Sequence, residues 1–167
     1  MPNSPYNNLD WGLWFQWIMA TTLGWVLGRF LLPNLAMVMI GIGLGLFQWL
    51  ILLKRIANAW RWIIATILGW SIGAGIIVFF LPPGNDFIAG LLSGITLGIP
   101  QWWILKDEVN WSIWWIVINI VAWTTGMEFL PGILLTGVVV GTLTGIALIL
   151  LMCFPKPVIS TKQEIQS

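Results

Sequence analysis

The stretches WIMATTLGWVLG (Trp17–Gly28), WIIATILGWSIG (Trp62–Gly73) and WIVINIVAWTTG (Trp115–Gly126) align with one another without a gap. Tryptophan opens each copy and returns eight residues later, and glycine follows three residues after that. Three copies of one segment in a chain of 167 residues indicate an internal repeat. The repeat therefore decides how the rest of the sequence is interpreted.

A glycine-rich segment follows each tryptophan segment, with glycines four residues apart: Gly41 and Gly45, then Gly94 and Gly98, then Gly137, Gly141 and Gly145. Glycines at this spacing share one helix face and let a neighbouring backbone come close, which drives helix association in lipid. We expect these glycines to pack helices together. The glycine face of the last segment is also our candidate for a dimer interface.

Glutamine and tryptophan adjoin each other in two glycine-rich segments, GLGLFQWLILLK (Gly43–Lys54) and GIPQWWILK (Gly98–Lys106). The pairs are Gln48-Trp49 and Gln101-Trp102, and the third copy has Leu148-Ile149 there. An unpaired amide in hydrocarbon costs several kcal/mol, so each glutamine needs a partner.

One position of the tryptophan segments offers that partner, because Thr21, Thr66 and Asn119 occupy it in the three copies. A hydrogen bond between Gln and Thr or Asn would hold two helices in register. The alternatives are a polar contact to a bound ligand, or an axial ligand to the metal of a porphyrin. Because Leu148 replaces the third glutamine, Asn119 is where we would look first for a bound molecule.

Composition and run length indicate a membrane protein, because 59% of residues are hydrophobic and 8% are charged. An apolar run of about 20 residues crosses a ~30 Å hydrocarbon layer as a helix. Six runs are candidate transmembrane helices: Trp11–Leu32, Leu35–Leu53, Trp62–Leu81, Phe87–Leu105, Trp111–Met127 and Ile133–Phe154. The fold class is all-α, with three helical hairpins at 11–54, 60–106 and 111–154.

Short tails, 1–10 and 155–167, flank the transmembrane domain 11–154. Six cations fall on the side that holds both tails, Lys54, Arg55, Arg61, Lys106, Lys156 and Lys162, and only Arg29 falls on the other. Because positive loops stay cytoplasmic, both termini are expected in the cytoplasm. We leave open whether the hairpins form a closed ring or a row, and the degenerate third copy favours the row.

The tryptophans fall into two sets. An aromatic belt at the membrane interface explains those at the cytoplasmic helix ends, Trp11, Trp14, Trp60, Trp62, Trp111, Trp114 and Trp115. Trp25, Trp70 and Trp123 lie about 12 Å deeper, at 1.5 Å per residue. They either fill space beside glycine-lined helices or offer a flat stacking surface to a ring system or polyene.

Catalysis finds little support in the sequence. The chain has no histidine, one cysteine and one tyrosine, so few groups can exchange protons. Metal-ligand spacing and clustered intramembrane charge are also missing from the pattern, and the net charge of +1 gives no basis for nucleic-acid binding. We therefore expect that this protein is not an enzyme.

The element Gly45–Gly73, which recurs at Gly98–Gly126, resembles a repeat of uncharacterised multi-pass membrane proteins of cyanobacteria and other bacteria. The resemblance covers about residues 11–150, and the third hairpin departs from it. It implies a photosynthetic bacterial membrane. In helix number, length and tryptophan content the chain is also similar to the substrate-binding subunits of vitamin uptake transporters, in topology only.

These observations lead to two functional hypotheses. The first is a non-enzymatic protein of the bacterial inner or thylakoid membrane, an accessory or assembly subunit of a photosynthetic complex. It would bind other membrane proteins or a second copy of itself through its glycine faces, or a lipophilic pigment such as chlorophyll or carotenoid. The second is a small-molecule-binding subunit of an uptake transporter. The candidate binding residues in either case are Gln48, Trp49, Gln101, Trp102, Trp25, Trp70, Trp123 and Asn119.

Overall fold

The computed structural model describes residues 9–30, 35–129 and 132–156, which form six helices and, within those ranges, no strand. The helices are α1 (Trp11–Phe30), α2 (Ala36–Leu52), α3 (Arg61–Phe80), α4 (Asp86–Glu108), α5 (Trp114–Glu128) and α6 (Ile133–Met152). The all-α prediction is therefore confirmed, with one helix for each predicted run.

Three of these helices, α3, α4 and α6, are long and apolar enough to cross a membrane. The helices α2 and α5, with 17 and 15 residues, are shorter. The predicted start at Trp111 is wrong by three residues, because Trp111 lies in a turn at φ 62°, outside helical geometry.

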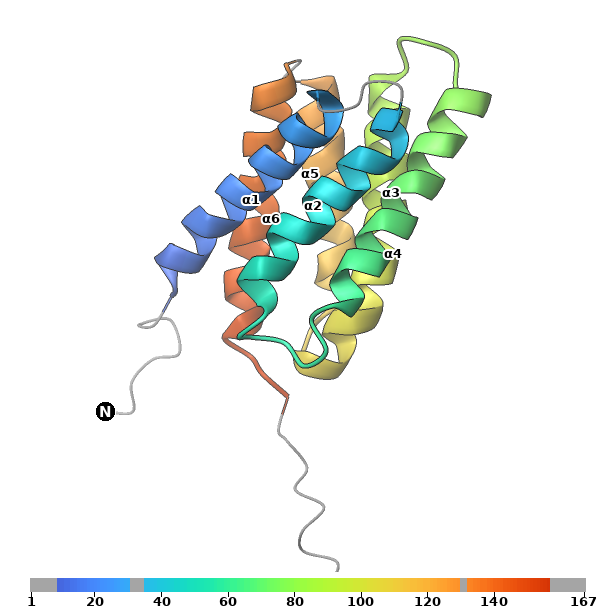
Figure 1. Cartoon of the computed structure of the whole chain (residues 1–167). Helices are drawn as coiled ribbons and strands as arrows, with labels where there is room; N and C mark the ends of the chain where they lie inside the picture. Colours follow the sequence, from blue (N-terminus) through green and yellow to red (C-terminus); the bar gives the residue numbers. More distant parts are fainter. Residues whose placement is uncertain (1–8, 31–34, 130–131, 157–167) are drawn as a thin grey trace, which may run out of the picture.

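The six helices run alternately up and down and form a closed ring (Figure 1). Each helix packs against the next one in the chain, and α6 packs against α1. The prediction that the three hairpins form an open row, which the degenerate third copy favoured, is therefore wrong. The ring closes because α6 keeps the glycines needed for a close interface, although it has lost the Gln-Trp pair.

The glycines of the even helices form the contacts between one hairpin and the next. Gly45 lies against Ile63 of α3, and Gly98 lies against Ile116 of α5. A Cβ placed on Gly141 would come within 2.8 Å of the Ile18 Cα in α1. The glycine face of α6 is thus occupied by α1 of the same chain, and our expectation that it forms a dimer interface is wrong.

Tryptophans from the odd helices fill the centre of the ring in two layers. Trp17, Trp62 and Trp115 form the first layer, with ring centroids 5.7–6.0 Å apart in edge-to-face arrangements. They are at most 1% exposed, so the interfacial belt predicted for Trp62 and Trp115 is wrong. An indole on an odd helix can face the centre of the ring as readily as its rim.

The second layer consists of Trp25, Trp70 and Trp123, each pair of which has centroids 5.3 Å apart. It lies eight residues further along the same helices, or about 12 Å. The remaining tryptophans predicted for the belt include Trp11, Trp60 and Trp114, which are exposed. Each odd helix therefore contributes one indole to each layer, and three hairpins make an approximately threefold core.

The end of the ring where the described chain begins and finishes is tied by polar contacts. The Asp10 carboxylate accepts the Leu13 amide at 2.9 Å and pairs with Arg55 at 2.8 Å. These two contacts lower the pKa of the Asp10 carboxyl below its ordinary value. The hydrogen bond from the Leu13 backbone N–H is the larger cause. Both contacts hold the start of α1 in place, and the ion pair joins it to the loop after α2.

The close interfaces predict different costs for two glycine substitutions. In Gly94→Ala the new Cβ would lie 2.7 Å from the backbone carbonyl oxygen of Asn119, so α4 and α5 must separate. We expect a loss of about 1–3 kcal/mol in the free energy of unfolding, measured in detergent micelles.

Gly126→Ala is the matched control. Its Cβ would meet side-chain methyls of Thr136 and Val140 at 3.2 Å and the Thr136 carbonyl oxygen at 3.3 Å, so a shift of a few tenths of an ångström suffices, against contacts of 2.4–2.7 Å at Gly94. The gain in helix propensity, about 1 kcal/mol, then offsets the crowding. Equal losses for the two variants would contradict the close backbone contact at Gly94.

Candidate functional site

A layer of amides and hydroxyls separates the two tryptophan layers, and Gln48 is its first member. The Gln48 amide nitrogen donates to the Thr21 hydroxyl at 3.1 Å, and its carbonyl oxygen accepts the Trp62 indole N–H at 3.0 Å. Because Thr21 is on α1 and Trp62 is on α3, this α2 side chain connects both of its neighbouring helices.

Gln101 repeats the same arrangement one hairpin later. It donates to the Thr66 hydroxyl and accepts the Trp115 indole N–H, each at 3.0 Å. The predicted Gln–Thr bonds are therefore confirmed at both glutamines. The indole donors were missed, although the sequence held a signal for them: in both cases the donating tryptophan opens the next hairpin and follows its glutamine by 14 residues.

The third position of the polar layer is rearranged. Leu148 is fully buried where glutamine would stand, and Trp17 donates its indole N–H to the Thr144 hydroxyl at 3.0 Å instead. Thr144 in turn donates to the Val140 carbonyl. The leucine and the polar residue have thus exchanged places by one turn of helix, since Leu44 and Leu97 match Thr144.

Asn119 satisfies its donor within its own helix, through the Trp115 carbonyl at 2.9 Å. It is 3% exposed and lines a small cavity at the centre of the ring, beside Gln48, Gln101 and Thr144. The volume of this cavity is about 10 Å³, roughly enough for one water molecule. The cavity beside Asn119, where we expected a bound molecule because the third glutamine is missing, therefore has no room for a molecule larger than water.

The deep tryptophans occupy the space between the helices themselves. Trp25, Trp70 and Trp123 are 7%, 5% and 2% exposed, and their rings contact one another. The indole nitrogens of Trp25 and Trp70 have no hydrogen-bond partner among the described residues. The faces of the neighbouring indoles are the weak acceptors at hand in this layer. The layer leaves no open stacking surface.

The remaining candidates, Trp49 and Trp102, are half-buried and pack at the outer side of the first tryptophan layer. The Lys106 ammonium lies 5.9 Å from the Trp102 ring and 3.4 Å from the Trp103 ring. Of the eight candidate binding residues, the ring therefore gathers six at its centre and leaves two near its surface.

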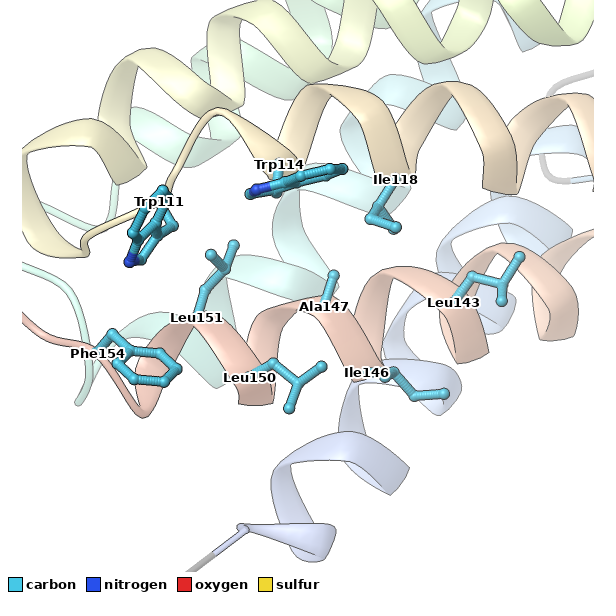
Figure 2. Close-up of a pocket in the computed structure, with 9 residues that line it drawn as sticks. All are labelled: Trp111, Trp114, Ile118, Leu143, Ile146, Ala147, Leu150, Leu151 and Phe154. Carbon is cyan, nitrogen blue, oxygen red and sulfur yellow. The ribbon is translucent and has the colours of Figure 1, made fainter. Parts of the chain in front are cut away.

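The outer wall has a groove within each hairpin, between its two helices. The groove between α1 and α2 includes Phe47 and Leu50, and the groove between α3 and α4 includes Pro100 and Trp103 at the same repeat positions. Between α5 and α6 these positions are Ala147 and Leu150 (Figure 2). The three volumes are about 260, 280 and 360 Å³, so the third groove is the largest.

The α5–α6 groove also differs in chemistry. Gln16 and Arg61 line the other two grooves at a position that Trp114 occupies here. Figure 2 shows the indoles of Trp111 and Trp114 opposite Leu150, Leu151 and Phe154 of the α6 end. Aliphatic side chains, Leu143 and Ile146 among them, continue the groove along α6. Its lining is almost entirely carbon.

Trp111 holds an unfavourable backbone conformation at the end of this groove. Its φ is 62°, in the left-handed region, and Asn58 has φ 52° at the matching position of the preceding loop. Asparagine tolerates this region, whereas a bulky residue there is a genuine outlier that costs on the order of 1–3 kcal/mol. The same left-handed turn thus occurs in both loops of the repeat, and placing tryptophan in it lowers the stability of the protein.

No family model, curated protein or solved structure matches this chain. Function must therefore be argued from the polar layer, the closed interior and the outer grooves.

The exchange of Thr144 and Leu148 predicts a strong coupling between the two positions. Thr144→Leu alone removes the acceptor of the Trp17 indole, and Leu148→Gln alone crowds a complete polar layer. In the double variant, the introduced glutamine can accept from Trp17 and donate to Asn119, as its counterparts bind tryptophan and threonine. We expect the double variant to be more stable than the sum of the single effects predicts, by about 1 kcal/mol.

The measurement is a double-mutant cycle on the free energy of unfolding in detergent. Gln101→Leu is the reference variant, since it orphans Trp115 and Thr66 with no compensation and should cost about 1–3 kcal/mol. Additive effects in the cycle would show that the third position does not share the geometry of the other two.

Proposed function

We propose that this chain is an integral membrane protein with six spans and both termini in the cytoplasm, in a bacterial inner or thylakoid membrane. Large apolar side chains are exposed on the outer faces of the helices, including Phe15, Leu68, Val121 and Leu135. The 20 residues of α1, α3 and α6 give about 30 Å each, the thickness of the hydrocarbon layer. Water would be a poor solvent for such a surface.

The proposed role is non-enzymatic: the protein binds partner membrane proteins or a lipophilic pigment, such as chlorophyll or carotenoid, as an accessory or assembly component of a photosynthetic complex. The observation that supports it best is the contrast between a filled interior and an apolar, grooved outer wall. The central cavity has room for one water, whereas the α5–α6 groove has a volume of about 360 Å³. Binding is therefore assigned to the outer wall.

No observation favours the second hypothesis, an uptake-transport subunit. It needs a pocket lined by the deep tryptophans and the two glutamines. Those side chains fill one another's space and complete one another's hydrogen bonds.

Orientation is tested with single cysteines in a Cys153→Ser background. Ala57→Cys and Pro83→Cys replace exposed residues of loops at opposite ends of the ring. Because the cations of the chain cluster at the Ala57 end, we expect a membrane-impermeant maleimide to label the Pro83→Cys variant in intact cells of a bacterial host that has no thylakoids and carries the protein in its inner membrane. The Ala57→Cys variant should be labelled only after lysis.

Two other labelling patterns would contradict the proposed topology. The reverse pattern would overturn the orientation. Labelling of both variants in intact cells would overturn the number of spans.

Binding is tested by mild purification from photosynthetic membranes, followed by an absorption spectrum and a mass measurement of the particle. We expect a pigment band or a mass well above one 18.7 kDa chain plus its detergent. Membranes without the protein, carried through the same steps, are the control. A colourless single chain would contradict the proposed role and leave the membrane placement intact.

A further inference from the structure

We propose that the α5–α6 groove holds one hydrocarbon chain of an anionic membrane lipid, whose headgroup lies at Lys156. The inference rests on the membrane placement proposed above and adds a specific ligand to it. A lipid is chosen over a pigment or a partner helix from the shape, the lining and the charge of the groove.

The shape and lining fit a single chain. From Leu143 to Leu151 the groove follows α6 for eight residues, or about 12 Å, and Phe154 lines it just beyond the end of the helix. The lining offers almost no polar atoms, so a polar ligand would lose its hydrogen bonds to water without replacement. A helix is about 10 Å across and would rest over the groove instead of entering it.

Departures from the repeat make this groove unlike the other two. Ala147 stands where Phe47 and Pro100 stand, and the smaller side chain deepens the groove. Trp114 replaces a polar or charged residue, which removes the group least compatible with a hydrocarbon chain. Both changes act in the same direction, toward an apolar ligand.

The backbone of Trp111 supplies an independent observation. At a left-handed turn position where the preceding loop has asparagine, this loop has Trp111, and the Trp111 indole forms the end wall of the groove (Figure 2). Residues held in such sparsely populated conformations concentrate at binding sites, where the position of the side chain outweighs the strain. An interfacial belt accounts for the 69% exposure of this indole but not for its place on a left-handed turn.

Charge at the groove's end selects the headgroup. The segment after α6 pairs with residues 108–110, through the amides of Asn110 and Lys156. Lys156 comes two residues after Phe154, the last lining residue of the groove in the chain, so it stands just beyond the groove's end. The Lys156 ammonium donates to the Lys106 carbonyl and, within the described chain, has no carboxylate in salt-bridge range.

The charged groups near this end are two lysines and two carboxylates, Lys106, Lys156, Asp107 and Glu108, and within the described chain none of them forms a salt bridge. The Glu108 carboxylate accepts the Ala57 amide at 3.0 Å and is thus held toward the other loop. The Lys106 ammonium lies over the Trp103 ring, which lines the α3–α4 groove, so this cation belongs to the α3–α4 side of the ring. Asp107 is half-exposed on α4 and shares this end of the ring. An anionic phosphate would complement the Lys156 ammonium, which has no carboxylate partner in the described chain.

The test reconstitutes the full chain into bilayers of equal phosphatidylglycerol and phosphatidylcholine, extracts it in mild detergent, and counts retained lipids by native mass spectrometry. We expect one retained lipid, anionic over zwitterionic by about fivefold, since a lysine near an anionic surface contributes about that factor. Lys156→Gln should bring the ratio close to one while a lipid is still retained.

Two variants address the groove itself. Trp111→Asn, copied from the preceding loop, should lose the retained lipid while the melting temperature stays equal or rises, because the turn is relieved. Ala147→Phe, copied from α2, should lose the lipid by filling the groove. Phe47→Ala in the α1–α2 groove is the matched control and should leave retention unchanged.

Equal retention in wild type, Trp111→Asn and Ala147→Phe would overturn the proposal, as would an unselective lipid in the wild type. A pigment that is displaced by Ala147→Phe would also overturn it and would assign the groove to the pigment. A chain recovered from the aqueous fraction without detergent would instead refute the membrane placement itself.

Discussion

An amide group carries an acceptor at one end and donors at the other, and in an apolar interior both ends must find partners. Gln48 and Gln101 meet this demand by reaching two different helices each, a threonine on one side and an indole on the other. Because the bonds have fixed lengths, they set both the height at which neighbouring hairpins align and the angle between them. The threefold tryptophan layers above and below depend on that alignment, since three indoles meet edge to face only when their helices are in register.

The filled centre has a consequence for the kind of protein this is. Each tryptophan layer closes the axis of the ring, and the polar layer between them completes its own hydrogen bonds, so the axis offers neither a path nor a pocket to a solute larger than water. The glycine faces are equally committed, because each brings one helix against the next. What remains for recognition is the outer wall, where the copies have diverged most. The repeat is kept in the two tryptophan layers, is rearranged at Thr144 and Leu148 in the polar layer, and is lost on the outer wall where the α5–α6 groove forms.

The repeat allowed the hairpins, the helix-packing glycines and the Gln–Thr bonds to be predicted, because all of these follow from positions matched along the chain. The closed ring could not be predicted, because no local pattern specifies which helix the glycines of α6 will contact. The first tryptophan layer was missed for a different reason. Distance from the helix end suits Trp62 and Trp115 to an interfacial belt, whereas the spacing Trp17, Thr21, Trp25 places all three on one face and already indicates a shared interior. The groove depends on Ala147 and the turn at Trp111, which have meaning only once the hairpins are superposed.

Closure of the ring by α6 also bears on how the chain reaches its final form during synthesis. While the first two hairpins are being synthesised, the face of α1 that will receive Gly137 and Gly141 stays uncovered, and the indole of Trp17 has no Thr144, 127 residues later, to bind. A partly made chain is therefore an open arc with two unlike edges, each able to pair with the wrong helix from a neighbouring chain. The last helix is what turns that arc into a single unit, so truncation before α6 would remove the closure of the whole ring along with one hairpin's packing.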